Sequence, residues 1–229
     1  MNRKPLKVIG ATVGAAMLFA ACGSSGSDNT ATDDDQTSST ASAQTAANGS
    51  DSPASGLRAG LTSLLQEHVY LAGITTGTAL SGEDYTAAAA ALEVNTQGLQ
   101  DAISSVYGDA GGKQFGDLWR KHIGFFVDYT VGKATSDDAK VEAARTALDG
   151  YRSDFGAFIE SATKGALPKD AVAEELSGHV ESLFAAIDAQ AAKDPSSVEK
   201  LRMAANHMPM TAAVLAAAIT GQFPDKFDS

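Results

Sequence analysis

The chain is poor in cysteine, tryptophan and proline, with one, one and six of them among 229 residues. A single cysteine excludes an intramolecular disulfide framework. So few prolines, with abundant alanine and no long stretch of alternating polarity, favour helices over strands. Basic residues are also scarce, at 17 against 28 acidic ones. This acidic balance excludes nucleic-acid binding and adhesion to anionic lipid by charge alone.

Sequence motifs of common enzymes and cofactor sites are missing as well. The chain has no HxxxH, HExxH or ExxH, so neither the zinc-protease nor the di-iron carboxylate pattern applies. It has no CxxCH, so any bound haem would be non-covalent, and it has no nucleophile elbow or phosphate-binding glycine loop. We therefore predict that the protein is not an enzyme.

The first 21 residues have the pattern of an export signal. Arg3, Lys4 and Lys7 precede an apolar run from Val8 to Ala21, which is too short to span a bilayer comfortably. The run ends in Leu18-Phe19-Ala20-Ala21-Cys22, which resembles the bacterial lipobox, with Phe19 in place of the usual leucine. The resemblance implies cleavage before Cys22, its lipidation, and a membrane anchor on the extracytoplasmic face; cleavage of an ordinary secretory signal is the alternative.

Residues 22–56 are predicted to be a tether. After Cys22 they contain no aromatic residue and no Leu, Ile, Val or Met, so they cannot bury enough apolar area to fold. Without residues 1–21 and their three positive charges, 14 basic residues face 28 acidic ones. The remaining 57–229 are long enough for one domain with its own core.

Apolar residues recur at helical spacing throughout 57–229, which predicts an all-α domain of about six helices. The expected breaks are residues 81–84, Gly108 with Gly111-Gly112, residues 136–138, residues 167–170 and residues 194–197. We expect Pro209 to bend the last helix. The breaks divide the domain into three hairpins of about 55 residues, which predicts a bundle of three repeated helical hairpins.

All four histidines follow this repeat. His68, His122 and His179 lie 54 and 57 residues apart, each with an apolar residue three positions before it and a β-branched residue directly after it. His207 lies 28 residues beyond His179, and Asn95 and Tyr151 occupy the corresponding positions after the other two. This placement favours a site built from imidazoles in the bundle core, for a transition metal or a small ligand.

Two further observations leave the identity of a ligand open. Met203, His207 and Met208 cluster on the last helix, and thioether with imidazole suits copper; zinc, iron and, less favoured, haem are the alternatives. Glu67, Asp128 and Asp188 are candidate carboxylate partners. The competing interpretation is a structural or protein-interaction module whose histidines only satisfy hydrogen bonds in the core, because duplication copies a residue whether or not it is used.

Segments from LLQEHVYLA through LWRKHIGFFVDYTVG and HVESLFAAID to QFPDKF are similar to an uncharacterised family of helical domains. Its members are secreted and lipid-anchored bacterial proteins, and some are labelled copper amine oxidase-like. Copper amine oxidases are β-rich enzymes with an Asn-Tyr-Asp/Glu cofactor motif, and this chain has no Asn-Tyr pair. The resemblance therefore implies location and an all-α fold, without an activity.

Overall fold

The computed structural model describes residues 52–227, and every regular element in this range is a helix. This confirms the all-α class and the count of about six helices. The predicted signal, Cys22 and nearly all of the tether lie outside the described residues. The helices are α1 (Pro53–Ser81), α2 (Thr86–Thr135), α3 (Asp138–Ala162), α4 (Lys169–Ala191), α5 (Ser197–Asn206), α6 (Met208–Gln222) and α7 (Pro224–Phe227).

The long α2 folds back on itself at Gly108. That residue has φ 78° and ψ 171°, a conformation that glycine adopts without steric cost. The side chain of Arg120 donates hydrogen bonds to Glu93 and Gln100, 27 and 20 residues earlier, so the two halves of α2 run antiparallel. A Cβ added to Gly112 would collide with the Ser104 hydroxyl, so the halves approach closely beside the turn. The break predicted at Gly108 is confirmed, and α2 supplies two of the six rods.

Helix α1 begins at Pro53, four residues before the predicted start of the domain. Ser52 caps it by accepting a hydrogen bond from the Ser55 backbone N–H, and proline suits the first helical position because its missing N–H has no helical partner. Gly82, with φ 78°, ends the helix in the left-handed conformation. The short polar cap at Ser52 thus draws the last residues of the expected tether into the bundle.

Helices α3, α4 and α5 begin where the sequence predicts. Asp137 caps α3 by accepting from the Lys140 N–H at 3.0 Å, and Pro168 directly precedes α4. The last rod divides into α5 and α6 at His207, because Pro209 cannot donate to the helical ladder. The helix predicted to run through Pro209 is thus interrupted just before that residue.

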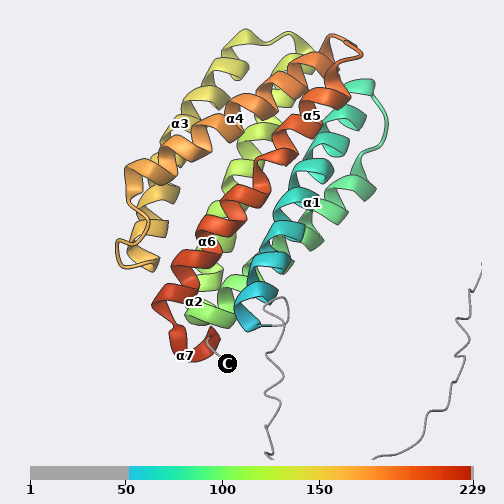
Figure 1. Ribbon diagram of the computed structural model, residues 1–229. Coiled ribbons are helices and arrows are strands. Elements are labelled where there is room, and N and C mark those ends of the chain that lie inside the picture. The colour runs from blue at the N-terminus through green and yellow to red at the C-terminus, as the bar shows by residue number, and fades with distance from the viewer. Residues whose placement is uncertain (1–51, 228–229) are drawn as a thin grey trace, which may run out of the picture. The chain divides into compact units, whose positions relative to one another are not determined.

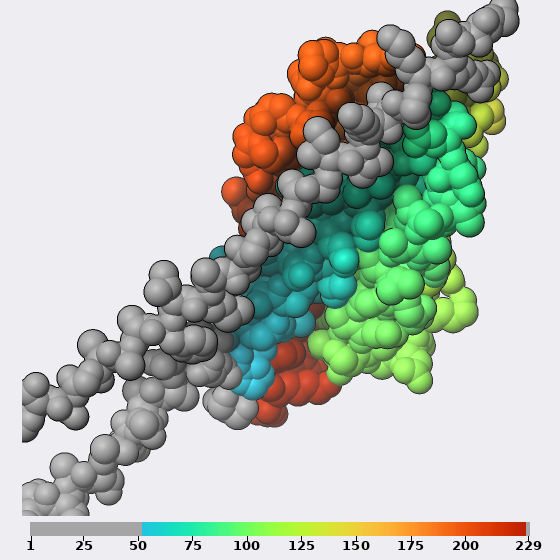
Figure 2. All heavy atoms as spheres, turned by 90° about the vertical axis from the view of Figure 1, so that its right-hand side faces the viewer, coloured from blue at the N-terminus to red at the C-terminus, as the bar shows by residue number. Residues whose placement is uncertain are grey.

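The rods pack as one elongated bundle. Helix α1 packs against α2, α4, α5 and α6, whereas α3 packs between α2 and α4 (Figure 1). The face formed by α1 and α2 lying side by side is shown in Figure 2. Among residues 52–227, no helix combines the length and the apolar character that crossing a membrane requires.

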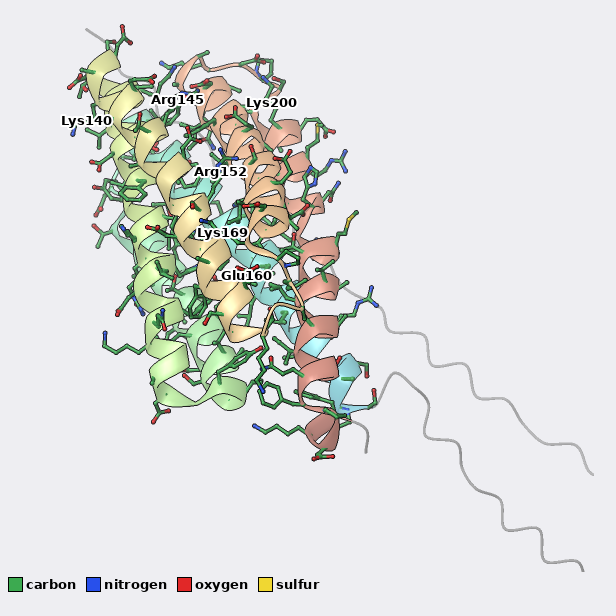
Figure 3. All side chains as sticks on the ribbon, turned by 90° about the vertical axis from the view of Figure 1, so that its left-hand side faces the viewer. Lys140, Arg145, Arg152, Glu160, Lys169 and Lys200 are labelled. Atoms are coloured by element: carbon green, nitrogen blue, oxygen red, sulfur yellow. The ribbon has the colours of Figure 1, made fainter. Side chains whose placement is uncertain are left out.

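A polar network joins α2, α3 and α4 near one end of the bundle. The buried Tyr129 hydroxyl donates to Asp188 at 2.8 Å and accepts from Arg145 at 3.0 Å. Lys133 pairs with the same Asp188 carboxylate at 2.9 Å, and the Arg145 guanidinium lies 4.3 Å from the centre of the Phe184 ring. Arg145 lies along α3 between Lys140 and Arg152 (Figure 3). This network fixes the relative position of three rods around the core.

Candidate functional site: a buried histidine cluster

Two of the repeated histidines meet in the bundle core. His68 on α1 and His122 on α2 approach with their Nε2 atoms 3.4 Å apart, and their ring centres are separated by 5.3 Å. Both residues are almost fully enclosed, with 2% and 4% of their surface exposed. The sequence predicted that the histidines would lie in the core, and for these two the structure brings them into direct contact.

Local sequence explains why both rings point inward. Leu65 and Val69 on α1 are buried on either side of His68, and Trp119 is buried one turn before His122. Residues three and four apart share a helix face, so an apolar neighbour at that spacing carries the imidazole into the core. The repeated positions noted in the sequence are therefore core positions of two facing helices.

An aromatic shell surrounds the pair. The Trp119 ring lies 4.8 Å from His68 and 4.6 Å from His122, and the Tyr151 ring stacks on His122 at 5.1 Å. Phe126 adds an edge contact to His122 at 6.2 Å. Such a shell excludes water and leaves no room for a porphyrin between two rings that touch.

Burial keeps the pair uncharged. Burial and, secondarily, the charge of His179 lower the pKa of His68 to about 3. The pKa of His122 is also held well below its usual value, first by burial and then by His68 and His179. The Trp119 carbonyl raises the pKa of His122, although it makes no hydrogen bond of good geometry to the Nδ1 atom of His122. A single N–H···N bond between neutral rings then requires opposite tautomers.

His179 on α4 is the third member of the cluster. Part of this residue reaches the surface, but its Nδ1 atom is enclosed and has no hydrogen-bond partner. Burial, and secondarily the charge of His207, lower the pKa of His179 to about 4. His179 lines the same small hollow as Trp119, whose ring contacts both His68 and His122, so the three imidazoles lie in one region of the bundle.

The remaining predicted ligands are not drawn into this cluster. His207 is exposed at the junction of α5 and α6, and Met203 is 55% exposed. Met208 is buried and lines a hollow together with His179. The helix face that Met203 shares with His207 in the sequence therefore lies at the surface.

The three candidate carboxylates have other partners. Glu67 accepts from the Asn95 amide at 2.8 Å, Asp188 accepts from Tyr129, and Asp128 lies 3.8 Å from Lys140. Within residues 52–227, no group of three or more His, Cys, Asp or Glu side chains is arranged to hold a metal ion. Any metal at the pair would begin with two imidazole ligands.

Several buried polar atoms around the pair have no hydrogen-bond partner. They are the Nδ1 atoms of His68, His122 and His179, the indole N–H of Trp119 and the hydroxyl of Tyr151. Burial raises the pKa of Tyr151 well above its ordinary value, so the hydroxyl keeps its proton. Each unmet group costs about 1–3 kcal/mol, and native proteins rarely leave so many together. Their concentration on adjoining rings marks this region as the candidate site.

A small apolar hollow is lined by His179, and a second, outer hollow lies beside it. The inner hollow, about 60 Å³, lies between His179, Trp119 and Met208. The outer hollow, about 200 Å³, lies between α4 and α6 and is lined in part by Val172 and Val214. Both are lined by the same five residues, Phe155, Glu175, Leu176, Thr211 and Leu215. The two hollows are therefore neighbours, and the inner one is lined by His179.

Sequence reasoning did not identify Glu175 as part of the site and gave Tyr151 no role there beyond its repeat position. Glu175 stands four residues before His179, a spacing that places both on one helix face. Tyr151 was visible as the residue 29 positions after His122, yet its stacking on that ring depends on how α3 packs. The Glu-His spacing was the available signal for the first residue, and the repeat was the signal for the second.

No family model, no curated protein and no solved structure matches this chain significantly. The similarity to a family of secreted and lipid-anchored helical domains, expected from the sequence segments, therefore gains no support from these comparisons.

Proposed function

We propose that this chain is a surface lipoprotein whose helical domain binds a first-row transition-metal ion through His68 and His122. The lipobox-like sequence at Cys22 supports anchoring on the extracytoplasmic face. The observation that carries the metal proposal is the pair of facing, neutral imidazoles in a shell of unpartnered polar atoms. His179 is our candidate for a third ligand.

The distance between the Nε2 atoms of His68 and His122 fits two ligands of one metal ion. Zinc–imidazole bonds are about 2.0–2.1 Å long, and two of them at a tetrahedral angle place the nitrogen atoms about 3.3–3.4 Å apart. The two Nε2 atoms lie 3.4 Å apart. A modest outward movement of either ring would also admit the wider angles that copper accepts.

The protonation state favours metal binding as well. A metal requires the lone pair of a neutral imidazole and competes with protons for it. Because burial holds the pKa of His68 at about 3, protons compete little at neutral pH. With both Nε2 atoms bound to the metal, the buried Nδ1 atoms of His68 and His122 would both carry hydrogen. The Trp119 carbonyl lies near the Nδ1 atom of His122 as an acceptor for that hydrogen.

A structural role is the second candidate, and one observation favours it. The two imidazoles share a single hydrogen bond through their Nε2 atoms, as a core polar pair would. In that case the domain would be a scaffold or protein-interaction module of the cell envelope. Metal retention separates the two functions.

The test is elemental mass spectrometry of the purified full chain after exposure to Zn²⁺, Co²⁺, Cu²⁺ or Fe²⁺ and removal of free ions. We expect about one ion per chain, lost in His68→Gln/His122→Gln and kept in His207→Gln, whose imidazole is exposed. Retention that persists in the double variant would place the metal elsewhere. No retention by the folded wild-type chain would refute the metal proposal and favour the scaffold.

We also propose that the domain is built from three repeated hairpins. Asn95, 27 residues after His68, bonds to the Leu64 carbonyl and to Glu67 beside that histidine. Tyr151, 29 residues after His122, stacks on it, and His207 acts on the pKa of His179. In each hairpin the second helix thus places a polar residue near the histidine of the first, which supports duplication of one unit.

The anchor has its own test. Mass spectrometry of the protein extracted from a bacterial membrane should show a chain that begins at Cys22 and carries acyl groups. Cys22→Ser should abolish acylation. A wild-type chain that is cleaved elsewhere and carries no lipid would refute anchoring and indicate an ordinary secretory signal.

A further inference from the structure

The outer hollow is an apolar depression between α4 and α6, at a place where the side chains of a tightly packed bundle would fill the space. Helices α4 and α6 separate toward the end of the bundle that holds α7 (Figure 1). Between them, the hollow of about 200 Å³ is lined by Leu167, Val172, Leu176 and Leu215. A cavity of about 150 Å³ is large enough to hold a benzene molecule. The outer hollow therefore has room for a single ring or a short alkyl chain.

Apolar residues also remain uncovered at its rim. Met210 and Val214 line the hollow from α6, with 67% and 49% of their surface exposed. Exposed apolar residues that gather around a concavity are typical of a ligand-binding site, whereas scattered ones need no explanation. The rim and the hollow together present a continuous apolar surface from solvent to Phe155.

Two polar groups border this surface, Glu175 at its exposed edge and His179 at its inner end. Glu175 lines both hollows, and its carboxylate accepts a hydrogen bond from the Thr211 hydroxyl at 3.1 Å. One turn further along α4, His179 lines the inner hollow, and its enclosed Nδ1 has no partner. Apolar sites commonly orient a ligand by a few such groups. A carboxylate selects a head group that donates hydrogen bonds and carries positive or no charge.

We propose that the outer hollow binds a small amphiphile with an apolar body and a neutral or cationic hydrogen-bond-donating head. The body lies against Val172, Leu176 and Leu215, and the head donates to Glu175 near Thr211. The chain has 28 acidic against 17 basic residues, and this negative balance disfavours anionic ligands, as the Glu175 carboxylate does. This site does not include His68 or His122 and does not depend on the metal proposal.

The protein carries its own reporter for such binding. Trp119 is the only tryptophan in the sequence and lines the inner hollow, which adjoins the outer one through Phe155. A ligand entering the hollows changes the polarity and packing around the indole. Fluorescence titration of the metal-free full chain with octylamine, octanol and octanoate therefore reads the site directly. Cys22→Ser in the background prevents an attached acyl chain from competing.

We expect saturable changes with octylamine and octanol at concentrations below their aggregation, and affinity for octanoate weaker than for octylamine by at least about tenfold. Glu175→Gln should reduce that difference about tenfold. Ala171→Phe, which fills the outer hollow, should abolish binding. Ala173→Phe, on another face of α4 beside Arg152, should leave binding intact.

Circular dichroism of each variant establishes that it is folded before it is titrated. A change that does not saturate, equal affinity for octanoate and octylamine, or equal loss in Ala171→Phe and Ala173→Phe would overturn the proposal. Because no metal is present in this assay, its failure would leave the test of metal retention unaffected.

Discussion

Acid should destabilise this domain through its buried histidines, well before most carboxylates titrate. His68 has a pKa of about 3 in the folded chain, against 6.5 for an ordinary histidine. The unfolded chain therefore binds more protons between these values, so the free energy of unfolding falls as the pH drops below about 6.5. Stability is fully present above that value and continues to be lost until about pH 3.

The magnitude follows from the shift. One pKa unit corresponds to about 1.4 kcal/mol, so at pH 5 His68 alone removes about 2 kcal/mol relative to pH 8. His122 and His179, whose pKa values are also lowered by burial, act in the same direction. Domains are stable by about 5–15 kcal/mol, so the loss is a substantial part of the total.

The assay is urea denaturation of the metal-free chain at several pH values between 8 and 5, for the wild type, His68→Phe and His207→Phe. His68→Phe should show a pH dependence smaller by about 2 kcal/mol, whereas His207→Phe, altered at an exposed site, should change the pH dependence less, chiefly through the secondary effect of the His207 charge on the pKa of His179. An unchanged pH dependence in His68→Phe, or an NMR titration of His68 near pH 6.5, would refute the reasoning.

Three further predictions concern packing, hydrogen bonding and metal binding. Gly156→Ala should destabilise the chain by about 1–3 kcal/mol in urea denaturation, because its Cβ would lie 2.5 Å from the Lys169 carbonyl oxygen. Gly150→Ala, with open space around it, should stabilise the chain by about 0.5–1 kcal/mol. The opposite order of stabilities would contradict the packing of α3 on α4. Tyr129→Phe should cost about 1–2 kcal/mol by the same measurement, because Asp188 and Arg145 lose a shared partner; an unchanged midpoint would mean that water replaces the hydroxyl. Zn²⁺ at 100 times its dissociation constant should raise the free energy of unfolding by about 2.7 kcal/mol in the wild type and not in His68→Phe; equal stabilisation of both would place the ion at another site.

Much of the fold was readable from the sequence because its signals are local. Caps, glycines and prolines mark helix ends through backbone chemistry alone, as Asp137, Gly108 and Pro209 illustrate. The start of α1 was missed by four residues, since the apolar pattern begins at Leu57 whereas the serine cap and proline act earlier. Local signals do not specify which rods are neighbours.

The candidate site was predictable only in part. The repeat indicated that His68, His122 and His179 belong together, and the pKa effects among them agree with this grouping. The same repeat also suggested His207, which is exposed at the junction of α5 and α6. The contact of Tyr151 with His122 and the hollows beside Glu175 depend on the packing of rods distant in sequence, which periodicity does not encode.

X-ray absorption at the zinc edge, measured on the full chain loaded with one equivalent of Zn²⁺, tests the central claim most directly. The account predicts at least two imidazole nitrogens at about 2.0–2.1 Å from the metal, with their signature reduced in His68→Gln/His122→Gln. A spectrum of oxygen ligands alone, or one that the double substitution leaves unchanged, would contradict it.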